Sequence, residues 1–150
     1  MNVGQLCQRE VVTTQQGEEL CTAAQLMRSK HVGFLVVVEP SDGGRQRVVG
    51  VMTDRDIVIA VLAREVDTHQ LRVGDVMTRE PLLAEQTQPV ESVVSLMREV
   101  GVRRVPVIDK DGYLAGVLSI DDVLEVMAEQ LVNIADSLRS ERRAERALRQ

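Results

Sequence analysis

The sequence has almost no aromatic residues, with one Phe, one Tyr and no Trp among 150 residues. Proteins that bind single-stranded nucleic acid stack the bases on aromatic side chains, and this chain offers only Phe34 and Tyr113. Its formal net charge of −5 also gives no general attraction to phosphate backbones. We therefore expect no nucleic-acid partner, and an aliphatic core, because 44% of the residues are hydrophobic.

Cysteines and long apolar runs are also scarce. Cys7 and Cys21 form no CxxC pair, and neither His31 nor His69 has a Cys or Glu beside it at ligand spacing, so we predict no disulfide framework and no metal site. The longest apolar run, residues 57–63, is far shorter than the ~20 residues that span a bilayer. The N-terminus lacks the basic and apolar regions of a signal peptide. These features predict a cytoplasmic protein that does not associate with membranes.

Motifs of catalysis are missing as well. The chain has no nucleophile elbow, no arguable Ser, His and Asp constellation, and no glycine-rich phosphate loop with its Lys. We expect a protein that is not an enzyme, with no catalytic residues and no required cofactor.

An internal repeat is the main positive feature. Residues 26–28, Leu-Met-Arg, recur at 96–98, a shift of 70. The shift then falls to 66, because the turn at 41–47 is four residues longer than its counterpart, and residues 50–57 align with 116–123. The chain is therefore a tandem duplication.

Hydrophobic periodicity and turn residues predict the same β-α-β-β-α order in both copies. The elements expected in the first copy are 11–13, 18–30, 34–39, 47–52 and 53–64, and those in the second are 82–84, 90–100, 104–109, 113–118 and a helix from 119 onward. Asp-Gly within the turns between the β-rich runs favours hairpins, since Gly tolerates positive φ.

The repeat sets the domain organisation. We expect a first repeat at 1–64, a linker at 65–72, a second repeat at 73–130 and a helical extension at 131–150. One unit of this size buries too little surface to be comfortably stable, so the two copies are expected to share a core with pseudo-twofold symmetry. The predicted fold class is α+β.

Polar residues gather where a strand meets a helix in each copy, at 53–56 (Thr-Asp-Arg-Asp) and 119–122 (Ser-Ile-Asp-Asp). A helix N-terminus attracts anions such as phosphate. A carboxylate three residues after the hydroxyl can accept hydrogen bonds from the vicinal hydroxyls of a ribose, and Arg55 can neutralise phosphate charge. The pattern suits a nucleotide.

The same pattern has a second interpretation. Ser or Thr followed at the third position by an acidic residue also forms a capping box, which satisfies the helix N-terminus and needs no ligand. A duplication copies a cap as readily as a binding site. The alternative function is therefore a ligand-independent structural or protein-interaction module.

The repeat and its motifs resemble a pair of CBS domains, a regulatory unit called a Bateman module, here as a stand-alone protein of bacterial type. The resemblance rests on Gly-Val-Met-Thr-Asp-Arg-Asp at 50–56 and Gly-Val-Leu-Ser-Ile-Asp-Asp at 116–122. Val-Gly-Asp-Val-Met-Thr at 73–78 and Val-Arg-Arg-Val-Pro-Val at 102–107 are also similar to that family, and the likeness covers roughly residues 3–130.

The resemblance implies that adenosyl ligands bind in clefts between the two copies. The implied ligands are AMP, ADP, ATP, S-adenosylmethionine and NAD-type dinucleotides, acting as regulatory ligands. Asp56 and Asp122 match the family's ribose-binding acid, and Thr53 and Ser119 match its hydroxyl near the ribose and phosphate.

The same resemblance implies two unequal clefts. Arg55 favours a phosphate in the first, whereas Asp121 repels one in the second unless Arg103 or Arg104 supplies a cation. The first copy has Gly33 and Phe34 where the second has this basic pair. Base contacts are expected from strand segments near Thr13 and Leu83.

The C-terminal segment predicts self-association. Its apolar residues alternate by three and four, as in a coiled-coil seam: Leu124, Met127, Leu131, Ile134 and Leu138. The Arg-rich end from 139 to 150 is expected to be a solvated helix. We expect a homodimeric adenine-nucleotide sensor that changes shape, or its affinity for an unidentified protein partner, when ligand binds.

Overall fold

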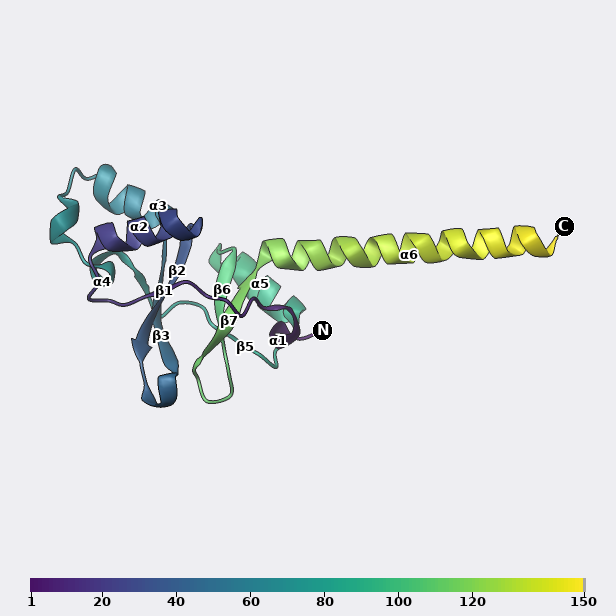
Figure 1. The fold of residues 1–150 in the computed structure, drawn as a ribbon, viewed down its shortest axis with the longest axis horizontal. Helices are drawn as coiled ribbons and strands as arrows, with labels where there is room; N and C mark the ends of the chain where they lie inside the picture. The colour runs from purple at the N-terminus through teal and green to yellow at the C-terminus, as the bar shows by residue number, and fades with distance from the viewer. Residues whose placement is uncertain (150) are drawn as a thin grey trace.

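The computed structural model describes residues 1–149 and contains two small β-sheets, one for each repeat (Figure 1). Gln150, the last residue of the expected extension, lies outside the described residues. The first sheet has the order β1 (Thr13–Thr14), β2 (Phe34–Pro40), β3 (Gln46–Thr53), β4 (Thr78–Arg79). The second has the order β5 (Ala84–Glu85), β6 (Arg104–Ile108), β7 (Leu114–Ser119).

The two sheets share one pattern of pairing. In each, the short first strand runs parallel to the second, and the second and third form an antiparallel hairpin. Gly43 and Gly112 in the two turns adopt positive φ, 70° and 85°. The α+β class and the repeated architecture predicted from the sequence are confirmed.

The helices follow the expected order with differences in detail. The helices are α1 (Val3–Leu6), α2 (Leu20–Lys30), η1 (Asp42–Gly44), α3 (Asp54–Ile57), η2 (Val58–Leu62), η3 (Thr68–Gln70), α4 (Val73–Val76), α5 (Val90–Val100) and α6 (Ile120–Leu148). The helix expected at 53–64 instead divides into α3 and the π-helical η2, in which the Ala63 amide donates to the Val58 carbonyl five residues earlier over 3.1 Å.

The short helices α1 and α4, which the sequence analysis did not predict, exchange between the repeats. Val3 and Cys7, from α1 and its C-terminal end, pack into the core that α5, β6 and β7 form in the second repeat. Val73 and Met77, from the equivalent position after the linker, pack into the core of α2, β2 and β3 in the first repeat. The shared core therefore consists of two clusters, each completed by the other repeat.

Backbone hydrogen bonds hold each exchanged segment on a strand of the other repeat. The amides of Gln8 and Val117 each donate to the other's carbonyl over 2.9 Å. At the pseudo-symmetric place, β4 pairs with β3. A glycine lies under each crossing, because a Cβ on Gly116 would lie 2.6 Å from the Gln8 carbonyl oxygen, and one on Gly50 would lie 2.7 Å from that of Thr78.

A second contact joins the two hairpin turns, which lie side by side in Figure 1. The guanidinium groups of Arg45 and Arg47 stand 4.1 and 4.5 Å from the centre of the Tyr113 ring. The hydrogen bond from Ser41 and these two positive charges lower the pKa of the Tyr113 hydroxyl. The sole tyrosine thus ties the first hairpin to the second.

Helix α6 projects away from the rest of the molecule (Figure 1). It has 29 residues, so it is about 43 Å long. Val123 is its only buried residue. Within residues 1–149, no helix combines the length and hydropathy needed to cross a bilayer.

The crossing glycines generate a stability prediction. Gly116→Ala is expected to lower the free energy of unfolding by about 1–3 kcal/mol, because backbone of the exchanged segment must shift to admit the methyl group. Urea unfolding followed by circular dichroism measures the change.

Gly17→Ala is the matched control, since no atom lies within 4 Å of the place that a Cβ would take there and its φ is not in the left-handed region. Equal effects of the two substitutions would contradict the argument that the crossing requires glycine.

Candidate functional site

Two pockets lie where the repeats meet, and each is lined by both. The first, called the Asp56 pocket, has a volume of about 570 Å³ and contains Thr53 and Asp56 together with residues 100–104 of the second repeat. The second, called the Asp122 pocket, has a volume of about 340 Å³ and contains Ser119 and Asp122 together with residues 31–34 of the first repeat. The duplication therefore produces a pair of pseudo-symmetric sites.

The exchanged segments supply the third wall of each pocket. Gln8, Glu10 and residues 11–12 line the Asp122 pocket. Their counterparts at a shift of 70, Thr78, Glu80 and residues 81–82, line the Asp56 pocket. Exchange of the N-terminal segments thus completes both sites.

Asp56 forms a capping box with Thr53 at the start of α3. The Thr53 amide donates to Asp56 Oδ2 over 2.8 Å, and the Asp56 amide donates to Thr53 Oγ1 over 3.1 Å. Within residues 1–149, Asp56 Oδ1 accepts no hydrogen bond. The cap therefore leaves one carboxylate oxygen of Asp56 available to a ligand.

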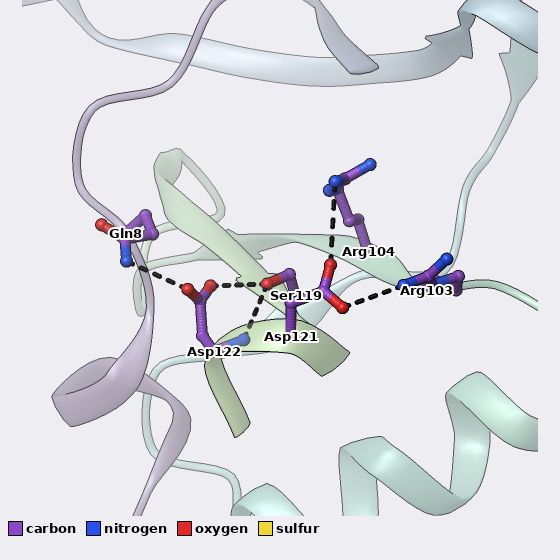
Figure 2. Close-up of polar contacts among 6 residues, drawn as sticks. All are labelled: Gln8, Arg103, Arg104, Ser119, Asp121 and Asp122. Atoms are coloured by element: carbon purple, nitrogen blue, oxygen red, sulfur yellow. Dashed lines mark hydrogen bonds and ion pairs between the residues drawn. The ribbon is translucent and has the colours of Figure 1, made fainter. Parts of the chain in front are cut away.

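Asp122 has both carboxylate oxygens engaged (Figure 2). Ser119 Oγ donates to Asp122 Oδ2 over 2.7 Å, while the Asp122 amide donates to Ser119 Oγ over 3.1 Å. Gln8 Nε2 donates to Asp122 Oδ1 over 3.2 Å. Since Thr78 takes the place of Gln8 at the Asp56 pocket, this last bond has no counterpart at Asp56.

Asp121 lies between two arginines on its own repeat, as Figure 2 shows. Its Oδ1 is 2.9 Å from Arg103 Nη2, and its Oδ2 is 3.9 Å from Arg104 Nη2. All three side chains are exposed, so these pairs contribute little to stability and can rearrange. Asp121 itself lines neither pocket.

The cations are unequally distributed between the pockets. Arg55, Arg103 and Arg104 line the Asp56 pocket, whereas Arg104 is the one arginine lining the Asp122 pocket among the described residues. Arg103 thus lines the same pocket as Asp56, and Arg104 lines both pockets. The acids lining the Asp56 pocket are Asp54, Asp56 and Glu80, and those lining the Asp122 pocket are Glu10 and Asp122.

The two repeats differ at the position that Arg103 occupies. A Cβ on Gly33 would lie 2.7 Å from Asp54 Oδ2, so a larger residue there would require the exposed Asp54 side chain to turn away. In the second repeat Ile120 replaces Asp54, and Arg103 occupies the Gly33 position. The amides of Asp54 and Ile120 donate to the carbonyls of Gly33 and Arg103 over 3.0 and 2.9 Å, so the backbone is the same in both.

The segments expected to contact a base lie close to the pockets, but their named residues do not line them. Thr13 lines a separate cavity of about 340 Å³. Leu83 lines neither pocket, whereas its neighbour Leu82 lines the Asp56 pocket. The sequence analysis missed Gln8 and Glu80, which the repeat alignment could have suggested only if the exchange of segments had been known.

The described residues include no group of three or more His, Cys, Asp and Glu side chains arranged to hold a metal ion. The chemistry that the two pockets offer is recognition by hydrogen bonds and charge: a carboxylate acceptor and guanidinium donors around a cavity of nucleotide size.

Comparisons with known proteins agree with the repeat. The family model described as CBS domain matches residues 3–63 and again residues 73–129. Hypoxic response protein 1 of Mycobacterium tuberculosis is 32% identical over 132 residues, which cover 88% of this chain and 85% of that protein.

Solved structures show the same fold. CBS domain protein PAE2072 from Pyrobaculum aerophilum, complexed with AMP, has a TM-score of 0.72 at 29% identity, covering 81% of this chain and 89% of that one. A hexameric CBS-CP12 protein from bloom-forming cyanobacteria has a TM-score of 0.71 at 29% identity, covering 83% of this chain and 66% of that one.

The caps make a prediction that needs no ligand. Asp56→Ala and Asp122→Ala should each lower the free energy of unfolding by about 1 kcal/mol, because each removes a hydrogen-bonded acceptor at a helix start. Asp75→Ala should cost a similar amount, since Asp75 Oδ2 accepts from the Arg72 amide over 2.8 Å at the start of α4 but lines neither pocket.

Urea unfolding of the three variants measures these costs. A gain in stability on removing Asp56 or Asp122, together with a loss on removing Asp75, would contradict a capping contribution at the two pockets.

Proposed function

This protein belongs to the CBS domain family as a tandem pair, and we propose that it is a non-catalytic regulatory module that binds adenosine-containing ligands between its two repeats. The proposed ligands are AMP, ADP and ATP, with S-adenosylmethionine and NAD(H) as further members of the class. No cofactor takes part, and the adenine nucleotide itself is the signal.

The observation that carries the proposal is the arrangement of Asp56. Its Oδ2 caps α3, and its Oδ1 accepts no hydrogen bond within residues 1–149. A ribose has adjacent hydroxyl donors that suit such an acceptor. Arg55 and Arg103 line the same pocket and provide charge for a phosphate.

The relationship to PAE2072 supports the choice of ligand class. That protein was solved in complex with AMP and is 29% identical to this chain over most of both lengths. We assign the ribose-binding role to Asp56 and Asp122, with Thr53 and Ser119 beside them.

The two pockets should differ in affinity. A ligand at Asp122 must displace or share the hydrogen bond from Gln8, and the pocket that it enters is lined by Glu10 and a single arginine, Arg104, among the described residues. The Asp56 pocket is larger and has three arginines. Polyphosphates should therefore bind at Asp56, and ligands of lower charge at Asp122.

The proposed mechanism is a shift in population between relative orientations of the repeats. Because residues from both repeats line each pocket, a bound nucleotide contacts both and favours the orientation that it fits best. Its effect is limited by the difference in its affinity for the two states. The signal would pass to a second copy or to a protein partner, in the cytoplasm.

The alternative is a ligand-independent structural or interaction module. It is favoured by the caps, which already engage Oδ2 of both Asp56 and Asp122, while Gln8 donates to Oδ1 of Asp122. In the regulatory module Asp56 caps α3 and also binds the ligand, whereas in the structural module it only caps α3.

Thermal melting with AMP, ADP, ATP, S-adenosylmethionine and NADH separates these functions. A ligand at 100 times its Kd should stabilise the nucleotide-stripped protein by about 2.7 kcal/mol per site. Asp56→Ala should abolish the rise for ADP or ATP, and Arg55→Ala should weaken these ligands more than adenosine.

Asp75→Ala is the matched control, because it removes a cap acid away from both pockets and should leave the ligand-induced rise intact. No rise with any ligand, or an equal loss of the rise in Asp56→Ala and Asp75→Ala, would favour the structural module. Product formation above a buffer control would instead indicate an enzyme.

A further inference from the structure

Helix α6 exposes a continuous apolar stripe along its first five turns. The residues of this seam are Leu124, Met127, Leu131, Ile134 and Leu138, each with an exposed fraction between 54% and 66%. None of them packs on the two core clusters. A stripe at this spacing is the seam of a two-stranded coiled coil, which one helix alone cannot bury.

The charges of α6 are divided sharply between its two halves. Residues 120–136 have five acidic side chains and no basic one, a net charge of −5. Residues 137–149 have five arginines and two glutamates, a net charge of +3. Two such helices attract each other when they run in opposite directions and repel when they run in the same direction.

We propose that α6 pairs in antiparallel orientation with α6 of a second copy, forming the contact that makes the protein a dimer. The seam defines the register. Leu131 faces Ile134 of the second copy, and Met127 faces Leu138 of the second copy, so four apolar layers stack around the twofold axis.

The same register brings opposite charges together at the ends of the seam. Arg142 of one copy lies beside Asp121 of the other. With Leu124 at position a of the heptad, both residues occupy position e, and the e positions of two antiparallel helices lie next to each other. Asp121 is exposed and its local partners, Arg103 and Arg104, are exposed as well, so the side chain is accessible. The dimer contact therefore reaches the partner of Arg103 and Arg104, two residues that line the Asp56 pocket.

A parallel pairing would bring like charges together. The seam positions after Leu138 are Glu141 and Glu145, and each would then face its own copy across the seam. The acidic halves would also lie side by side. In the antiparallel register, Glu141 instead falls opposite Leu124 of the second copy, beyond the four apolar layers.

Disulfide trapping distinguishes the orientations without any ligand, so its outcome is independent of nucleotide binding. Met127→Cys and Leu138→Cys are made separately in a Cys21→Ser background, where Cys7 stays buried. The two variants carry different affinity tags and are expressed alone or together. We expect a covalent dimer in mild oxidant only when both are present.

Cross-linking of each variant with itself would show a parallel pair and overturn the proposal, as would the lack of any cross-linked dimer. A second measurement uses light scattering on the full chain. Leu131→Glu should convert the dimer to monomer, whereas Val132→Glu, next to it with an exposed fraction of 59% but off the seam, should not. A monomeric parent chain, or equal effects of the two variants, would also overturn it.

Discussion

The crossing of each repeat's N-terminal segment over a strand of the other repeat is the constraint on which the rest of the structure depends. It requires glycine at 50 and 116, since the carbonyl oxygens of Thr78 and Gln8 would lie 2.7 and 2.6 Å from a Cβ. The crossing completes both hydrophobic clusters and leads the chain past both pockets. Core and candidate site therefore arise from one arrangement of the backbone.

On this symmetric scaffold, a few side chains make the two pockets chemically different. Arg103 beside Ile120 in the second repeat takes the place of Gly33 beside Asp54 in the first, which adds a cation to the Asp56 pocket. Gln8 donates to Oδ1 of Asp122, whereas Oδ1 of Asp56 accepts no hydrogen bond within residues 1–149. Duplication thus supplied two similar cavities, and local substitution made their charge and hydrogen-bonding capacity unequal.

Local sequence patterns were enough to predict several features: the repeat, the strand order within each hairpin, and the polar residues at 53–56 and 119–122. The exchange of α1 and α4 could not be predicted, since neither short helix shows in its own sequence which core it joins. For the same reason Gln8 and Glu80 were missed, and the base-contacting segments were assigned to Thr13 and Leu83 rather than to neighbouring residues that line the pockets. The caps could be predicted, but a cap and a ribose-binding acid use the same residue types, so sequence alone left them unresolved.

The central claim is that a nucleotide binds between the repeats beside Asp56. Amide NMR spectra of the uniformly ¹⁵N-labelled chain, recorded during titration with ADP, test it most directly. The account predicts saturable shifts at residues 53–56 of the first repeat and at 101–104 of the second, at lower ADP concentrations than any shift at Gln8 or 119–122. Shifts confined to one repeat, or no shifts at saturating ADP, would contradict it.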